Sequence, residues 1–171
     1  MKMLKGIIFY IFLFIFCVLA QVLIFNQIIL FHIAIPLIFV YFILRLPIDL
    51  KLAWVFTLSF FLGLTIDIFS DTPGVNALAC TIVAACRRPI FYAYVPKDDF
   101  TSHIVPSSSS LGIADFAKYL FTFIIIYCFL VFSIEYFNFA AVKDIMILSI
   151  SSSLLSFIIL LAADCLIPVN Q

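Results

Sequence analysis

Long apolar runs separated by short polar or turn-forming stretches dominate the hydropathy pattern of the chain. A run of about 20 apolar residues is the length that crosses a ~30 Å hydrocarbon core as an α-helix. The pattern therefore predicts an all-α, polytopic membrane protein with about six transmembrane helices. The expected spans, in one transmembrane domain over residues 1–171, are residues 6–25, 28–44, 52–69, 75–94, 113–134 and 142–167.

Two of the spans contain features that bear on their continuity. Pro36 lies inside the second span, where a proline removes a backbone donor and kinks or breaks a helix. Such a break is tolerated in a membrane when neighbouring helices satisfy the freed backbone groups. The first span follows Lys2 and Lys5 and exceeds the roughly 7–15 residues of a signal-peptide core, so we expect it to remain as a helix.

Composition supports the membrane assignment. Hydrophobic residues make up 67% of the chain and charged residues 11%, whereas soluble domains average roughly 45–50% and 25%. A globule of this size buries only about 70% of its unfolded surface, so the excess apolar surface is expected to face lipid. The formal net charge is zero, which provides no overall field to attract nucleic acid.

Basic residues gather on one side of the predicted topology. The residues on that side are Lys2, Lys5, Arg45, Lys51, Arg87, Arg88, Lys97 and Lys118. Because cytoplasmic loops carry the excess of lysine and arginine, this distribution places both termini in the cytoplasm. The polar connection at about residues 96–112 is expected to be a cytoplasmic loop.

The most informative polar residues stand at the turn between the third and fourth spans. The candidates for structural or partner contacts are Gly63, Asp67, Asp71, Pro73, Gly74 and Asn76. A glycine lets two helices approach closely, and a Pro-Gly pair reverses the chain. We expect Asp71 or Thr72 to cap the fourth helix, since the helix dipole favours an anion at the N-terminus.

Asp67 follows Gly63 by one helical turn and lies on the same face. A carboxylate close to hydrocarbon costs a few kcal/mol unless it is paired or hydrated. Asn76 offers a side-chain amide that can bond across the turn to this carboxylate. Two interpretations remain open: Asp67 and Asn76 lock the turn, or Asp67 contacts a partner or ligand directly.

The motif Gly-x-x-x-Asp-x-Phe-Ser-x-x-Pro-Gly-x-Asn-Ala-Leu covers Gly63–Leu78, and an Arg88-Pro89 pair closes the fourth span. With this length and helix layout, the chain resembles the rod shape-determining protein MreD family. The resemblance implies a bundle similar to the substrate-binding subunits of energy-coupling-factor transporters. It also implies a non-enzymatic subunit of the bacterial elongation complex, located in the cytoplasmic (inner) membrane and supporting cell shape and lateral peptidoglycan synthesis.

The partners implied by this resemblance are an MreC-type periplasmic coiled-coil protein, an MreB-type filament and a RodA-type polymerase with its transpeptidase, all within membrane lipid. A second interpretation is a vitamin-binding subunit of an energy-coupling-factor transporter. Such subunits resemble one another in an Ala-x-x-x-Ala contact on the first helix, whereas here Ala20 stands alone. An enzyme is the third class, but no Ser-His-Asp or metal-ligand pattern is visible, and no cofactor is expected.

Two further groups of polar residues have two interpretations each. Arg87 and Arg88 either anchor the fourth span at the cytoplasmic headgroups or dock a cytoplasmic partner. Serines recur in the last span, where small hydroxyl side chains either let helices pack closely or line a polar cavity. These serines are Ser149, Ser151, Ser152, Ser153 and Ser156. Asp164 and Cys165 near the end of that span have no histidine in reach, which disfavours a nucleophilic role.

Overall fold

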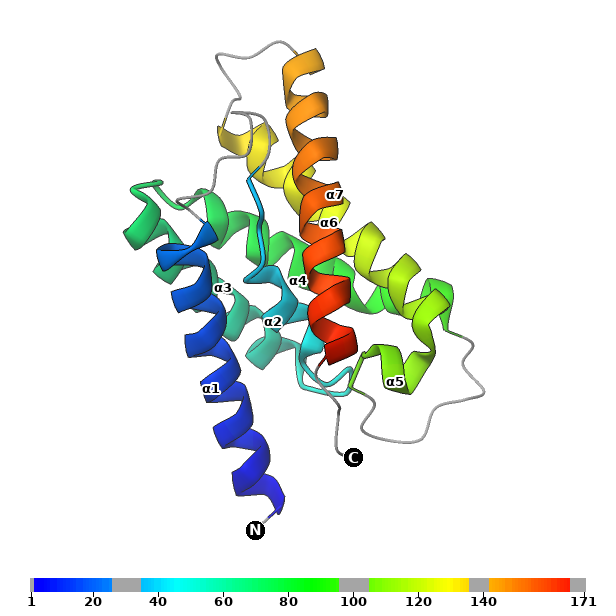
Figure 1. The fold of residues 1–171 in the computed structure, drawn as a ribbon. Coiled ribbons are helices and arrows are strands. Elements are labelled where there is room, and N and C mark those ends of the chain that lie inside the picture. Colours follow the sequence, from blue (N-terminus) through cyan, green and yellow to red (C-terminus); the bar gives the residue numbers. More distant parts are fainter. Residues whose placement is uncertain (1, 26–34, 96–104, 136–141, 167–171) are drawn as a thin grey trace.

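A computed structural model describes residues 2–25, 35–95, 105–135 and 142–166, and these residues form helices and connections without any strand. The helices are α1 (Lys2–Leu23), α2 (Val40–Arg45), α3 (Leu52–Ser70), α4 (Val75–Tyr94), α5 (Ser108–Leu111), α6 (Ile113–Glu135) and α7 (Val142–Leu166). The start of α1 and the end of α7 both lie toward the lower end of the molecule, and α5 lies beside the end of α7 (Figure 1). The end of α6 and the start of α7 lie at the upper end.

Three of these helices are long and apolar enough to cross a membrane. They comprise Leu52–Ser70, Ile113–Glu135 and, within α7, Ile145–Leu166. In the described part of the chain the protein is all-helical, and these helices identify it as membrane-embedded. Apart from the second span, the helices lie close to the positions predicted from the apolar runs, although α1 begins earlier than expected.

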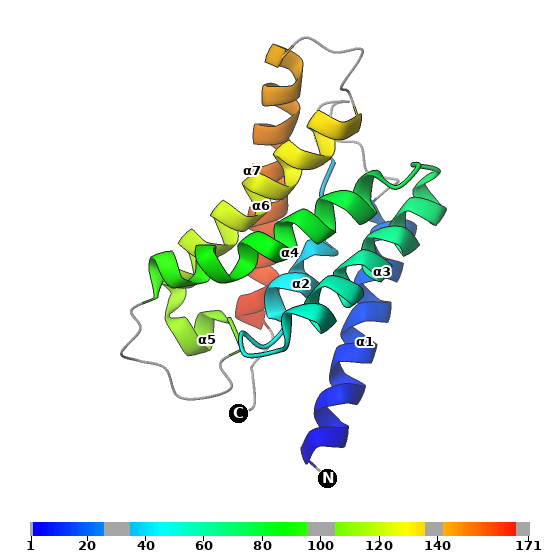
Figure 2. The same cartoon turned by 180° about the vertical axis from the view of Figure 1, so that it is seen from behind.

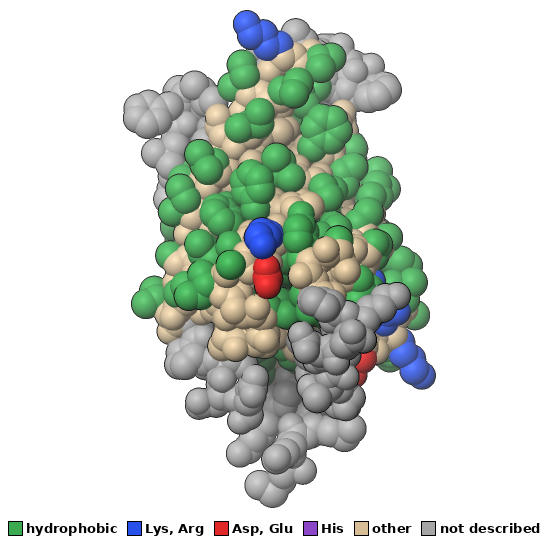
Figure 3. Space-filling model, turned by 90° about the vertical axis from the view of Figure 1, so that its right-hand side faces the viewer, with side chains coloured by type: hydrophobic (Ala, Val, Ile, Leu, Met, Phe, Trp, Pro, Cys, Tyr) green, Lys and Arg blue, Asp and Glu red, His purple; other side chains and the backbone are tan. Residues whose placement is uncertain are grey.

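The two faces of α7 have the reverse of the polarity seen in a soluble protein. The buried face carries polar residues at helical spacing, including Ser149, Ser152, Ser156 and Asp164. The opposite face exposes the apolar residues Met146, Ile150, Leu154 and Ile158, spaced by four. A helix on the surface of a soluble protein buries its apolar face and exposes its polar face to water. The exposed apolar face of α7 is therefore suited to contact with lipid. Figure 3 shows one side of the molecule on which apolar side chains cover most of the described surface.

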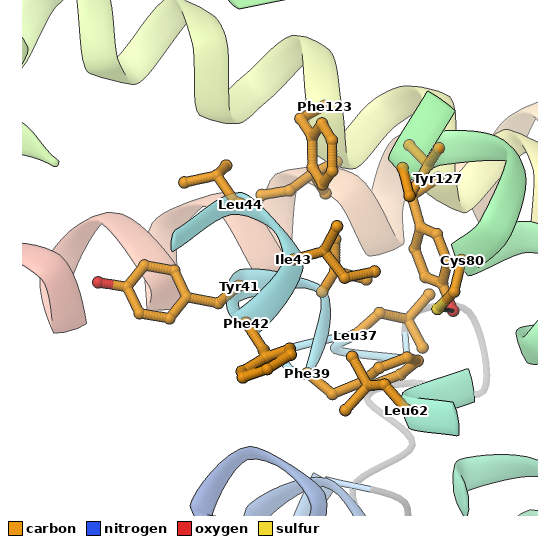
Figure 4. Packing of buried hydrophobic residues seen from close by; sticks show 14 of the residues in the cluster. Leu37, Phe39, Tyr41, Phe42, Ile43, Leu44, Leu62, Cys80, Phe123 and Tyr127 are labelled. Atoms are coloured by element: carbon orange, nitrogen blue, oxygen red, sulfur yellow. Dashed lines mark hydrogen bonds between the residues drawn. The ribbon is translucent and has the colours of Figure 1, made fainter. Parts of the chain in front are cut away.

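The short helix α2 occupies the centre of the bundle. All six of its residues are buried, which is the expected environment of a helix whose residues before Arg45 are all aliphatic or aromatic. Its side chains point in several directions, toward residues such as Leu62 of α3 and Phe123 of α6 (Figure 4). Phe39, which precedes the helix, packs edge-to-face on Tyr127 with ring centroids 5.7 Å apart.

The predicted helix over residues 28–44 is wrong for part of its length. Residues 28–34 lie outside the described part, Ile35–Ile38 are not helical, and the helix begins only at Val40. The physical reason is Pro36, which has no backbone N–H and excludes the preceding residue from the helical region. The sequence therefore placed the break correctly but overestimated the helix that surrounds it.

The predicted loop at about residues 96–112 contains a helical turn that the sequence pattern did not indicate. Its residues 96–104 lie outside the described part, and Ser108–Leu111 form the helical turn α5 within this connection. Ser107 caps this turn: its side chain accepts from the Ser110 N–H at 3.2 Å, while the Ser110 hydroxyl accepts from the Ser107 N–H at 3.0 Å. This reciprocal capping box satisfies backbone donors that would otherwise be unpaired.

Candidate functional site

The α3–α4 turn is built around the carboxylate of Asp67. Its Oδ1 accepts hydrogen bonds from the Thr72 hydroxyl at 2.6 Å and from the backbone and side-chain N–H groups of Asn76, both at 3.0 Å. Its Oδ2 accepts from the backbone N–H of Ala77 at 2.8 Å. The predicted contact between Asp67 and Asn76 is thus confirmed, and Tyr127 extends it by donating to Asn76 Oδ1 at 2.8 Å.

The expectation that Asp71 or Thr72 caps α4 is wrong. Gly74 occupies the N-cap position and has no side chain to accept a bond, and Asp71 is exposed. Asp67 instead reaches over from α3 and accepts the first free N–H groups of α4, at Asn76 and Ala77. A carboxylate at this position also interacts favourably with the helix dipole. Asp67, in the last turn of α3, therefore caps α4.

Gly63 and Gly74 each meet a different steric requirement of this turn. Gly74 adopts φ +80°, and Asp71 adopts φ 55°, in the left-handed region where glycine and aspartate are best tolerated. At Gly63 the requirement is space, because α3 and α4 lie side by side with their backbones in close approach (Figure 2). The backbone of α4 would occupy the position of any side chain at residue 63.

Replacing Gly63 by alanine is expected to lower the free energy of unfolding by about 2 kcal/mol. A Cβ there would lie 2.5 Å from Ala77 Cα and 2.5 Å from the Asn76 carbonyl oxygen, and backbone atoms cannot rotate away. Unfolding of purified protein by SDS titration measures the loss. Gly74→Ala in the same turn is the control, since a Cβ there meets nothing within 4 Å and adds only the strain of the left-handed conformation at φ +80°, about 1 kcal/mol. Equal losses in the two variants would contradict the close approach.

The non-helical segment Ile35–Ile38 is the second polar feature of the interior. The Gln21 side chain of α1 donates to the Pro36 carbonyl at 3.0 Å and accepts from the Ile38 N–H at 2.9 Å. Two serines of α7 bind other backbone groups of the segment. The Ser152 hydroxyl accepts a hydrogen bond from the Ile35 N–H at 3.1 Å, and the Ser156 hydroxyl accepts one from the Leu37 N–H at 2.8 Å. Side chains therefore replace the helical hydrogen bonds, as non-helical backbone at membrane depth requires.

This arrangement assigns a role to two of the predicted serines. The double substitution of Ser152 and Ser156 by alanine is expected to lower the free energy of unfolding by about 2 kcal/mol, because two buried backbone N–H groups lose their acceptors. Ser151→Ala in the same cluster is the control, because Ser151 is half-buried and makes no hydrogen bond to the described part of the segment. Thermal unfolding in mild detergent measures both, and a double variant as stable as the control would refute the assignment.

A third polar group, which the sequence did not predict, lies near the lower end of the bundle. Asp164 of α7 accepts from the Tyr41 hydroxyl at 2.5 Å and from the Ser108 N–H at 2.8 Å. Its Oδ1 also lies 3.4 Å from Nη1 of Arg45, and both side chains are buried. The ion pair joins α2 to α7, and the hydrogen bond from Ser108 adds α5. The sequence offered one signal for this group: Arg45 and Asp164 each stand at the end of an apolar run, and a charged residue in a membrane helix indicates a partner.

Arg87 does not have the predicted arrangement of a headgroup anchor, whereas Arg88 is half-buried and its role as an anchor stays a prediction. Arg87 is buried, and its Nη2 donates to the carbonyls of Leu46 and Pro47, both at 2.6 Å. Arg88 donates to the carbonyls of Ile48 at 3.2 Å and Leu50 at 2.8 Å. The two guanidinium groups therefore hold the α2–α3 connection, where they also compensate the negative end of the α2 dipole.

A cavity of about 350 Å³, called the upper cavity below, opens beside the α3–α4 turn. Its polar lining residues are Gln21, Ser70, Thr72, Asn76 and Glu135, and the other lining residues are apolar. The cavity thus brings together the turn, the non-helical segment and the end of α6. Pockets of roughly 300–1,000 Å³ with a few polar groups among apolar walls are typical of small-molecule sites.

The described residues contain no group of three or more His, Cys, Asp or Glu that is arranged to hold a metal ion. The fold and the inverted polarity of α7 define the class of the protein, a helical membrane protein. Comparisons with family models, with curated proteins and with solved structures found no match. The resemblance of Gly63–Leu78 to the MreD motif is therefore a hypothesis.

Proposed function

We propose that this chain is a non-enzymatic, multi-pass subunit of the bacterial elongation complex, which scaffolds its partners in the cytoplasmic membrane. The observation that carries the proposal is the Gly63–Leu78 stretch. Its motif residues are those that the turn uses: Gly63 for the close approach, Asp67 for the cap, and Asn76 for the bond between them. Motif residues that contact one another in a single turn support a family resemblance better than the same number of identical residues scattered along the chain.

The geometry of the turn supports a scaffolding role. The hydrogen bonds of Asp67 fix the backbone, while the side chains of Ile68, Phe69, Asp71 and Pro73 are exposed around it. A fixed turn with exposed apolar and acidic side chains gives a partner helix a preformed surface with little entropy to lose on binding. In this proposal, an MreC-type protein and a RodA-type polymerase with its transpeptidase contact this end, and an MreB-type filament acts from the cytoplasm.

The proposed topology has six crossings with both termini in the cytoplasm. It is supported by the start of α1 and the end of α7, which lie at the same end of the molecule, as an even number of crossings requires (Figure 1). The basic residues Arg45, Lys51 and Arg88 lie around the α2–α3 connection, at that same end of the predicted topology.

Deletion and affinity purification test the proposal. Deleting the gene is expected to make rod-shaped cells wide and round and to reduce lateral wall insertion. The protein purified in mild detergent is expected to bring a periplasmic coiled-coil protein and a polymerase with it. Asp71→Lys, an exposed change on the turn, should weaken this co-purification, whereas Lys51→Glu at the other end of α3 should leave the periplasmic partner bound. Unchanged cell width after deletion would overturn the proposal.

One observation favours the second candidate function, a vitamin-binding subunit of an energy-coupling-factor transporter. The upper cavity has the size of a small-molecule site and lies beside the non-helical segment Ile35–Ile38, and membrane carriers use non-helical backbone of this kind to line their substrate sites. The same purification separates the two functions. An ATPase module recovered in place of the polymerase would favour transport.

A further inference from the structure

One wall of the upper cavity is held in a fixed shape. Ile35, Leu37 and Phe39 all line it, as alternate residues of a non-helical segment do when they share one face. The backbone between them is held from both sides by Gln21 of α1 and by the serines of α7. The wall therefore needs no rearrangement to receive a ligand, which lowers the entropic cost of binding.

The charge of the cavity comes from one side chain. Glu135, the exposed last residue of α6, is the only ionisable group among the described lining residues, and it makes no ion pair or hydrogen bond with the described part of the chain. Asp67 is close by through Asn76, but its carboxylate already accepts four hydrogen bonds. The turn therefore contributes neutral donors and acceptors, and among the described residues that line the cavity the negative charge comes from Glu135.

The remaining lining residues determine what accompanies a positive charge. Phe39, Phe69 and Phe132 line the cavity, and aliphatic side chains complete the walls. An ammonium group is attracted both by a carboxylate and by the faces of aromatic rings, while an apolar body gains from leaving water. An anionic ligand would meet the Glu135 carboxylate without any cationic lining residue to offset it.

We propose that the upper cavity binds a small amphipathic amine, with its ammonium group at Glu135 and its apolar body against the phenylalanine rings and the Ile35–Phe39 wall. This proposal does not depend on the proposed scaffold function, because it rests only on the lining of the cavity. The amine has two sources with the same chemistry: a free molecule in the surrounding solution, or the headgroup of an aminophospholipid in the bilayer.

A pair of probes that differ in charge alone tests the proposal. The full-length protein is placed in nanodiscs of digalactosyldiacylglycerol, an uncharged lipid without an ammonium group, and binding of 4-phenylbutylamine and of 4-phenylbutanol is measured by isothermal titration calorimetry. The amine is expected to bind about tenfold or more tightly than the alcohol, because its contact with the carboxylate is charge-assisted. Glu135→Gln should remove this preference, and Asp115→Asn, an acid at the opposite end of α6, should keep it.

Two further measurements complete the test. Phe69→Ala, at an exposed lining residue, should weaken both probes together, which locates them in the cavity rather than at the Glu135 carboxylate alone. Adding phosphatidylethanolamine to the nanodiscs distinguishes the sources: competition with the amine supports a lipid headgroup, and its absence supports a free amine. Equal binding of amine and alcohol, no binding of the amine at millimolar concentration, or a preference that survives Glu135→Gln would overturn the proposal.

Discussion

Replacing Asp164 by alanine is expected to lower the free energy of unfolding by about 3–5 kcal/mol, the largest effect of any single change considered. The substitution leaves the Arg45 guanidinium buried without its carboxylate. It also removes the acceptor of the Tyr41 hydroxyl and of the Ser108 N–H. Arg45 retains a hydrogen bond to the Pro106 carbonyl at 3.3 Å, which is too little to compensate a buried charge. Equilibrium unfolding in mixed detergent micelles measures the difference.

The chain contains a matched control for this prediction. Asp115 and Lys118 form an ion pair at 3.0 Å on α6, with side chains about half exposed to the surroundings. Because an exposed pair contributes only about 0–1 kcal/mol, Asp115→Ala should lower stability by no more than that. Arg45→Leu combined with Asp164→Leu should recover part of the loss, since it removes both buried charges together. An Asp164→Ala variant as stable as Asp115→Ala would refute the structural role of the buried pair.

The apolar runs predicted the long helices well, because helix length and composition are local properties of the sequence. Pro36 marked the break before α2 for the same reason: the loss of its N–H acts on its own backbone. The bond from Asn76 to Asp67 was also predictable, since a tight turn brings residues nine positions apart into contact. In each case the cause and its effect lie within a few turns of chain.

The contacts that escaped prediction join distant segments. Tyr41 and Asp164 are 123 positions apart, and Ser156 is 119 positions from Leu37. Hydropathy patterns give the faces of a helix but not the order of helices around the core, so a polar residue could be recognised without its partner. Arg87 shows the same limit. Its position near a helix end suggested a headgroup anchor, whereas the fold surrounds it with the α2–α3 connection.

The choice of cap for α4 failed for a different reason. The sequence rule looks for the capping side chain at the N-cap or beside it, and Asp71 and Thr72 fit that rule. Gly74 occupies the N-cap with φ +80°, so the acceptor comes from Asp67 on the preceding helix. The close approach that Gly63 permits is what brings that carboxylate to the N–H groups of α4. Backbone packing, rather than local propensity, therefore decided which acid serves as the cap.

Asp67→Asn is expected to lower the free energy of unfolding by about 3 kcal/mol. The amide has the shape of the carboxylate, but its NH2 group is a donor in a place where every partner shown is also donating. These partners are the Thr72 hydroxyl, two N–H groups of Asn76 and the Ala77 N–H. Asp71→Asn makes the same chemical change four residues later, where the side chain is exposed, and should alter stability by less than about 0.5 kcal/mol.

The two variants also distinguish the interpretations of Asp67 that the sequence left open. If Asp67 locks the turn, Asp67→Asn destabilises the purified protein, and any loss of partner binding follows from that. If Asp67 contacts a partner directly, Asp67→Asn releases the partner while the purified protein unfolds at the same detergent concentration as Asp71→Asn. The four hydrogen bonds to the carboxylate and its burial to 4% exposure predict the first result. A partner would then contact the exposed edge of the turn, at Asp71 and Pro73, that Asp67 holds in position.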